Sequence, residues 1–215
     1  MNPKQYLEII AHLETCLDQF GDTPQGVDWP KAEDVDTRHR VMLGVVQPGL
    51  QARTSILDFG CGLSHFYDFL QRNKIDWVDY TGLDISEKYI ARSREKYPHN
   101  PYYCVDILED AGKLPQFDYV VMNGVFTEKV TLSHEAMFDY FQRLVKRVFE
   151  LARLGIAFNV MSKQVDWERE DLFHLPLDDL AWFLKRELTR YFVIRSDYGL
   201  YEYTVYVYRQ PSMMP

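Results

Sequence analysis

Apolar residues follow two different spacings along this chain, one typical of amphipathic helices and the other of short buried strands. Near the start, Tyr6, Ile9 and Leu13 share one helical face. The pattern predicts helices over residues 3–20 and 34–46, joined by a loop over residues 21–30 that is rich in Gly, Asp and Pro. From Ser55 onward, short apolar runs alternate with amphipathic segments. The predicted strands cover residues 55–59, 77–83, 102–105, 117–122 and 155–160, and the predicted helices cover 64–72, 87–97, 133–153 and 177–188.

The end of the chain breaks this alternation. Two β-forming runs, residues 192–195 and 202–209, are separated by only six residues, which is too short for a crossover helix. We therefore expect an antiparallel pair after a series of parallel strands. The predicted fold is α/β, a doubly wound, Rossmann-like sheet of seven strands with helices on both faces and an antiparallel C-terminal strand. Residues 1–50 are predicted as an N-terminal helical cap and residues 51–215 as the main domain, within one compact unit.

Composition narrows the class of protein. The 24 basic and 32 acidic residues give a net charge of −8 without a basic tract, which makes a nucleic-acid partner unlikely on this composition. Cys16, Cys61 and Cys104 lie far apart and form no Cys-x-x-Cys pair, so neither a zinc ribbon nor a disulfide framework is predicted. The sequence has no apolar run long enough for a transmembrane helix, and we expect a cytoplasmic protein, with homodimerisation left open.

Polar residues or glycines follow four consecutive predicted strands. The first strand leads into Gly60, Cys61 and Gly62, and the next three lead to Asp84, Asp106 and Asn123. In an open α/β sheet, ligands bind at the carboxyl ends of the strands. These residues therefore predict one binding site, built from four strand ends.

This set resembles the motifs of the class I S-adenosylmethionine-dependent methyltransferases, of the small-molecule or sugar type. Residues 56–64 (Ile-Leu-Asp-Phe-Gly-Cys-Gly-Leu-Ser) resemble the first motif, 80–86 the second, 104–107 the third and 117–124 the fourth. The resemblance covers residues 55–209 and includes the reversed last strand. One departure is Ser64, which stands where the family usually has a third glycine. Serine is a good helix N-cap, so we expect Ser64 to preserve the turn by capping the next helix.

The resemblance implies S-adenosylmethionine as the cofactor and assigns roles to the residues. Asp84 would accept the ribose hydroxyls and Asp106 the adenine amino group. Further cofactor contacts are expected from Asp58 inside the first strand, from Gly60, Cys61 and Gly62 of the glycine loop, and from Asn123 after the fourth strand. Ile85 and Ile107 would lie beside the adenine, and Arg38 of the cap would pair with the cofactor carboxylate.

The acceptor is expected to contact the loops after the fourth and fifth strands and the C-terminal hairpin. No catalytic base stands out, and the weak candidates are His174, Asp197 and His134. The acidic run formed by Asp166, Glu168, Glu170 and Asp171 is interrupted by Arg169, so we interpret it as a solvated charged segment and predict no metal site.

Three functions remain open at this point. We favour methyl transfer to a hydroxyl, amine or carboxylate of a small polar molecule, sugar or glycan unit. Asn123 is followed by Gly124 rather than by the Pro-Pro-Tyr that is typical of enzymes that methylate nucleobases or glutamine amides. The alternatives are a catalytically silent, methyltransferase-like binding subunit and, less favoured, an NAD-dependent oxidoreductase. The oxidoreductase would require a Gly-x-Gly-x-x-Gly loop that this chain lacks.

Overall fold

The computed structural model describes residues 4–29, 31–49, 52–110, 112 and 114–211. Residue 3, where the first helix was predicted to begin, and residue 30, where the loop was predicted to end, lie outside the described residues. The predicted boundary between cap and main domain, at residues 50 and 51, also lies outside them, and this division stays a prediction.

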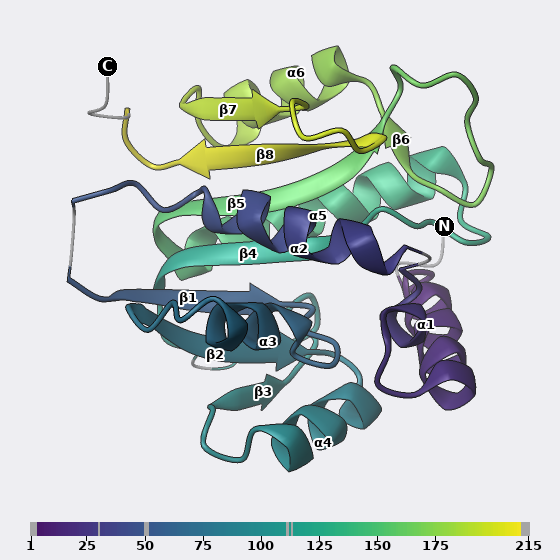
Figure 1. Ribbon diagram of the computed structural model, residues 1–215. Helices are drawn as coiled ribbons and strands as arrows, with labels where there is room; N and C mark the ends of the chain where they lie inside the picture. The colour runs from purple at the N-terminus through teal and green to yellow at the C-terminus, as the bar shows by residue number, and fades with distance from the viewer. Residues whose placement is uncertain (1–3, 30, 50–51, 111, 113, 212–215) are drawn as a thin grey trace.

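A mixed sheet runs through the centre of the molecule in the order β3-β2-β1-β4-β5-β8-β7 (Figure 1). The first five strands pair in parallel, and β8 is antiparallel to both β5 and β7. The strands are β1 (Thr54–Phe59), β2 (Val78–Asp84), β3 (Tyr102–Cys104), β4 (Phe117–Phe126), β5 (Ala152–Ser162), β6 (His174–Leu175), β7 (Phe192–Arg195) and β8 (Glu202–Tyr208).

Helices cover both faces of this sheet, because the strands carry apolar side chains on both sides. On one face, α2 and α3 contribute Met42 and Phe69 to a buried cluster with the strand residues Ile56 and Val121. On the other face, α5 and α6 pack against residues of β4, β5 and β8. The helices are α1 (Leu7–Phe20), the 3₁₀ helix η1 (Pro24–Val27), α2 (Ala32–Leu43), α3 (His65–Arg72), α4 (Glu87–Lys96), α5 (His134–Leu151) and α6 (Leu177–Glu187).

Helix α1 lies across the carboxyl ends of the strands, away from both helical layers (Figure 1). Ser86 donates a hydrogen bond to Glu14 of this helix at 2.6 Å, and the Tyr89 hydroxyl donates to the carbonyl of Leu13 at 2.7 Å. The strand order reverses between β1 and β4, which is where open α/β sheets bind ligands. Helix α1 therefore covers the expected binding site.

The predicted fold class is confirmed, with three differences in detail. The two-residue strand β6 pairs with β5 and adds an eighth strand. Strand β4 extends to Phe126, so Asn123 lies inside the strand and not after it. Between Met122 and Phe126, the pairing register of β4 with β5 shifts, and Gly124 adopts a φ of 83°. Residues 152 and 153 begin β5 and do not end the preceding helix, because Ala152 pairs with Phe117.

Candidate active site

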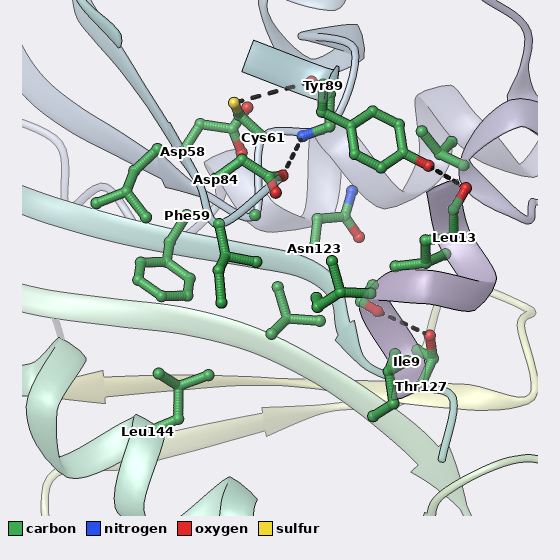
Figure 2. Close-up of a pocket in the computed structure, with 18 of the residues that line it drawn as sticks. Ile9, Leu13, Asp58, Phe59, Cys61, Asp84, Tyr89, Asn123, Thr127 and Leu144 are labelled. Carbon is green, nitrogen blue, oxygen red and sulfur yellow. Dashed lines mark hydrogen bonds between the residues drawn. The ribbon is translucent and has the colours of Figure 1, made fainter. Parts of the chain in front are cut away.

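The carboxyl ends of β1, β2 and β4 open into one cavity beneath α1, which we call the cofactor cavity. Nine of the ten residues predicted to bind the cofactor line it, although they come from four separate segments of the sequence. Figure 2 shows several of them around the cavity, with Ile9 and Leu13 of α1 on one side. The nine are Asp58, Gly60, Cys61, Gly62, Asp84, Ile85, Asp106, Ile107 and Asn123.

The glycine loop after β1 depends on two residues with positive φ. Gly60 has a φ of 72°, and a Cβ atom built on it would lie 2.7 Å from Cγ2 of Val125. Gly62 has a φ of 50°. The amides of Gly60 and Cys61 both donate to the carbonyl of Leu83, at 2.8 and 3.0 Å, which ties the loop to β2. The loop therefore lies close to the site without side chains that would fill it.

The prediction that Ser64 caps helix α3 is wrong. Ser64 stands at the N-cap position, but its φ of 59° is left-handed and its side chain makes no capping hydrogen bond. Its fully buried hydroxyl instead lies 2.9 Å from Ser93 Oγ and 2.9 Å from the Tyr102 hydroxyl. The left-handed conformation explains why glycine suits this position, and the two hydroxyl contacts fix the serine there.

Two buried carboxyl groups flank the glycine loop. Asp84 accepts hydrogen bonds from the amides of Gly62 and Ser86, each at 2.9 Å, while burial raises its pKa. Asp58 accepts a hydrogen bond from the Tyr80 hydroxyl at 2.9 Å. Burial, and to a lesser extent the nearby charge of Asp84, raises the pKa of Asp58 to about 7. A cationic group in the cavity would therefore meet two acids, one of which titrates near neutrality.

Asp106 connects the cavity to the cap. Its Oδ1 accepts from the amide of Leu108 at 3.0 Å, and its Oδ2 accepts from the Tyr6 hydroxyl at 2.5 Å. The ring of Tyr6 stacks on Tyr140 of α5, with centroids 4.8 Å apart. Tyr6 was not predicted as a site residue, because its helical spacing indicated only a core position.

Asn123 is the clearest indication that the cavity binds a polar ligand. Both the nitrogen and the oxygen of its amide are buried, and neither has a hydrogen-bond partner among the described residues. Figure 2 shows this amide pointing into the space between Asp84 and helix α1. Buried polar groups without partners are rare because each one costs about 1–3 kcal/mol. The Asn123 amide is therefore placed to bind a polar ligand.

Arg38, the tenth predicted residue, lies outside the cofactor cavity. Its Nε donates to Oε2 of Glu202 at 3.0 Å, and Glu202 is almost fully buried. The other oxygen of Glu202 accepts from Asn159, whose own amide oxygen accepts from the amide of Gly124. A buried carboxylate needs such a partner, which explains why Arg38 points here and not toward the cofactor cavity.

A second cavity, with a volume of about 410 Å³, opens beside the first, and we call it the acceptor cavity. Trp29, Thr127 and Glu128 line both cavities, so the two meet at these residues. The rim carries two exposed aromatic side chains, Trp167 and Tyr201. The volume falls within the usual range for small-molecule sites. Its charged and polar lining residues are Asp28, Lys31, Asp34, Arg38, Thr127, Glu128, Asp166, Arg169, His174 and Glu202.

The three predicted base candidates all contact other protein groups, and one of them, His174, lines a cavity. His174 lines the acceptor cavity, but its Nδ1 lies 2.6 Å from the carbonyl of Ser162 and its Nε2 accepts from the amide of Arg169. His134 contacts the carbonyl of His174 and lies outside both cavities. Asp197 also lies outside them, and its exposed carboxylate pairs with Arg195.

Two of the four acidic residues in the run after β5 form ion pairs. Glu168 pairs with Lys163 at 2.7 Å, and Asp171 pairs with Arg169. Both pairs are exposed to solvent. This arrangement agrees with our interpretation of the run as a solvated charged segment.

The chain is similar to known methyltransferases in sequence. Residues 57–153 match a family model described as a methyltransferase domain. The Mycobacterium tuberculosis protein Rv1506c, provisionally named as a methyltransferase, is 26% identical over 155 residues, which are 71% of this chain and 92% of that protein.

Solved structures share the fold. One is a SAM-dependent methyltransferase from Leishmania major, with a TM-score of 0.63, 15% identity, and coverage of 95% of this chain and 83% of that chain. Another is the magnesium protoporphyrin IX methyltransferase of Synechocystis PCC 6803 with bound SAM. It has a TM-score of 0.57, 17% identity, and coverage of 82% of this chain and 79% of that chain.

Residues 57–153 are therefore similar to a methyltransferase domain, and the chain has the fold of these solved SAM-dependent methyltransferases. Within the part of the chain that the structure describes, every helix is too short or too polar to cross a membrane.

Proposed function

We propose that this chain is a class I methyltransferase, which binds S-adenosylmethionine in the cofactor cavity and transfers its methyl group to a small polar molecule or sugar unit in the acceptor cavity. The observation that carries the proposal is the junction of the two cavities at Trp29, Thr127 and Glu128. Methyl transfer requires the donor and the acceptor to meet in line, and adjoining cavities allow this.

The residues of the cofactor cavity fit the cofactor. Asp84, already oriented by two backbone amides, suits a pair of ribose hydroxyls. The unpartnered amide of Asn123 offers both a donor and an acceptor. Asp58 suits the cofactor's ammonium group, and the glycine loop leaves room for the backbone to approach it. The departure at Ser64 does not obstruct the cavity, since that side chain is buried against Ser93 and Tyr102.

The acceptor cavity suits a polar organic molecule. Trp29 and the exposed Trp167 and Tyr201 offer flat apolar surfaces, while Lys31 and Arg169 offer hydrogen-bond donors. Aromatic walls with a few polar groups are typical of sites that orient a small ligand. This mixture supports a hydroxyl, amine or carboxylate acceptor on a small molecule or sugar. A homodimer and a cytoplasmic location stay predictions from the sequence.

Two measurements test the proposal. S-Adenosylhomocysteine should raise the melting temperature of the protein and NADH should not, because only a ligand that binds the folded state stabilises it. Methyl transfer from methyl-labelled S-adenosylmethionine is then measured with methyl glucoside, catechol, phenethylamine and benzoate, which represent the acceptor classes. Stabilisation by NADH alone would favour an oxidoreductase. Cofactor binding without transfer to any of the four compounds would favour the silent binding subunit.

A further inference from the structure

Glu128 occupies a fixed position at the junction of the two cavities. It lies just beyond β4, and its backbone forms a β-bridge with Leu172. On either side, the amide of Phe173 donates to the carbonyl of Thr127 at 2.8 Å, and the amide of Lys129 donates to the carbonyl of Asp171 at 2.9 Å. The segment is therefore held in place, and the Glu128 side chain, 18% exposed, is directed by a rigid backbone.

A path of ionisable groups leads from Glu128 to solvent. Its carboxyl group is hydrogen-bonded to that of Asp28, and Asp28 Oδ2 lies 2.7 Å from His12 Nε2. The same His12 nitrogen lies 3.9 Å from Glu128 Oε2. The side chains of Asp28 and His12 are 38% and 40% exposed. A proton on Glu128 thus has two neighbouring groups through which it can reach solvent.

The environment of Glu128 favours its protonated form. Burial is the largest cause and the charge of Asp28 the next, and together they raise the pKa of Glu128 to about 8. The charge of Asp171 also raises the pKa of Glu128, and the charge of Arg169 lowers it. The buried thiol of Cys16 lies 3.8 Å from His12 Nε2. Catalytic acids and bases commonly have a pKa close to the pH at which the enzyme works.

We propose that Glu128 is the catalytic base that removes the proton of a hydroxyl acceptor, and that Asp28 and His12 relay this proton to solvent. The inference rests on the proposed function and narrows the acceptor to a hydroxyl compound. As the acceptor oxygen bonds to the methyl carbon, the bond from that carbon to the sulfonium sulfur breaks, its electron pair stays on sulfur, and the hydroxyl proton passes to Glu128.

The charges at the junction argue against a carboxylate acceptor. A carboxylate acceptor carries no proton to remove, and it would meet the acidic pair of Glu128 and Asp28 at close range. A neutral hydroxyl is a weak nucleophile that a neighbouring base activates. His174, the histidine that lines the acceptor cavity, has both ring nitrogens within hydrogen-bonding distance of backbone groups, which leaves Glu128 as the better-placed base.

The first test measures the titration of Glu128 without any acceptor. Protein labelled with ¹³C at glutamate carboxyl carbons is titrated by NMR with S-adenosylhomocysteine bound. Glu128→Gln identifies the signal, and Glu170→Gln, a change to an exposed acid nearby, is the matched control. We expect one signal, absent only in Glu128→Gln, with a midpoint near 8. Asp28→Asn should lower that midpoint. Titration of Glu128 in the ordinary glutamate range would overturn the proposal.

The second test measures the rate of methyl transfer to the four acceptor compounds. Glu128→Gln should lower transfer to methyl glucoside or catechol by about 100-fold or more while binding S-adenosylhomocysteine as wild type does. The wild-type rate should rise with pH to a plateau above about 8, following the Glu128 carboxylate. Added imidazole should partly restore the rate of His12→Ala, which a purely structural role for His12 would not allow.

The outcomes separate the two proposals. Transfer by Glu128→Gln at the wild-type rate, or transfer by wild type only to phenethylamine or benzoate, would overturn the role of Glu128 and leave the proposed function intact. Failure of the wild-type protein to bind S-adenosylhomocysteine would instead contradict the proposed function.

Discussion

The amide of Gly62 donates a hydrogen bond to the carboxylate of Asp84 at 2.9 Å. This bond joins the glycine loop after β1 to the end of β2, although the two residues lie 22 positions apart. The amide of Ser86 donates to the other oxygen of Asp84, so the carboxylate is oriented before any ligand arrives. Loop and acid therefore act as one preorganised wall of the cofactor cavity.

Asp84→Ala should weaken binding of S-adenosylhomocysteine by about tenfold to a hundredfold, because hydrogen bonds to a charged group are worth about 1.5–3 kcal/mol. Isothermal titration calorimetry measures this. Asp79→Ala is the matched control, since Asp79 lies in the same strand but is exposed and pairs with Arg53. Unchanged affinity in Asp84→Ala would refute the assignment of Asp84 to the ribose.

Gly60→Ala should abolish or strongly weaken cofactor binding, because the new Cβ would lie 2.7 Å from Val125 in the wall of the cavity. Gly49→Ala is the control for backbone strain alone. Gly49 has a φ of 82°, and a Cβ there would meet nothing within 4 Å. Gly49→Ala should lose about 1 kcal/mol of stability from the strain of a side chain at positive φ, and Gly60→Ala should lose more because its Cβ also displaces Val125. Equal affinity for S-adenosylhomocysteine in the two variants would show that Gly60 is not part of the site.

Binding of S-adenosylhomocysteine should strengthen as the pH rises from 5.5 to 7.5. Asp58, whose pKa is raised to about 7, is protonated at the lower pH and ionised at the higher, and the ionised form attracts the ligand's ammonium. Below the pKa, the affinity should fall by about tenfold per pH unit. Asp58→Asn should give a flat profile, and a wild-type profile as flat as that of the variant would contradict this role.

The same carboxyl group should affect stability in the opposite direction. Its pKa in the folded state lies above the unfolded value of about 3.9, so the folded protein holds the extra proton between these values. Its contribution to stability is thus present below about pH 4 and is lost as the pH rises through 7. Asp58→Asn should therefore raise the melting temperature at pH 8 relative to wild type and have less effect at pH 4. Equal shifts at both pH values would contradict the raised pKa.

Asn123→Leu should stabilise the protein without ligand and weaken cofactor binding. The buried amide has no partner among the described residues, and an apolar side chain of similar size removes that penalty of about 1–3 kcal/mol. Urea unfolding and calorimetry with S-adenosylhomocysteine measure the two effects. A variant that is less stable and binds as wild type does would show that the Asn123 amide serves the fold and not the ligand.

The sequence was sufficient to predict the sheet and the strand ends that line the cofactor cavity. Carboxyl ends of parallel strands meet at one edge, so Gly60, Asp84 and Asp106 come together once the strands are recognised. The C-terminal hairpin was equally predictable, because its short connection allows only antiparallel pairing.

What the sequence did not reveal depends on contacts between distant segments. Arg38 pairs with Glu202, 164 positions away, and no local pattern indicates that choice. Glu128 stands out only once burial and the charge of Asp28 are known, because its sequence position indicates no more than a loop after a strand. The left-handed backbone of Ser64 is likewise fixed by Ser93 and Tyr102, which come from α4 and β3.

A crystal structure of the protein with S-adenosylhomocysteine tests the central claim most directly. We predict that the ribose lies at Asp84, the adenine beside Asp106 and Ile107, and the sulfur directed toward the junction at Trp29 and Glu128. A ligand bound elsewhere, or one whose sulfur faces away from the acceptor cavity, would contradict it.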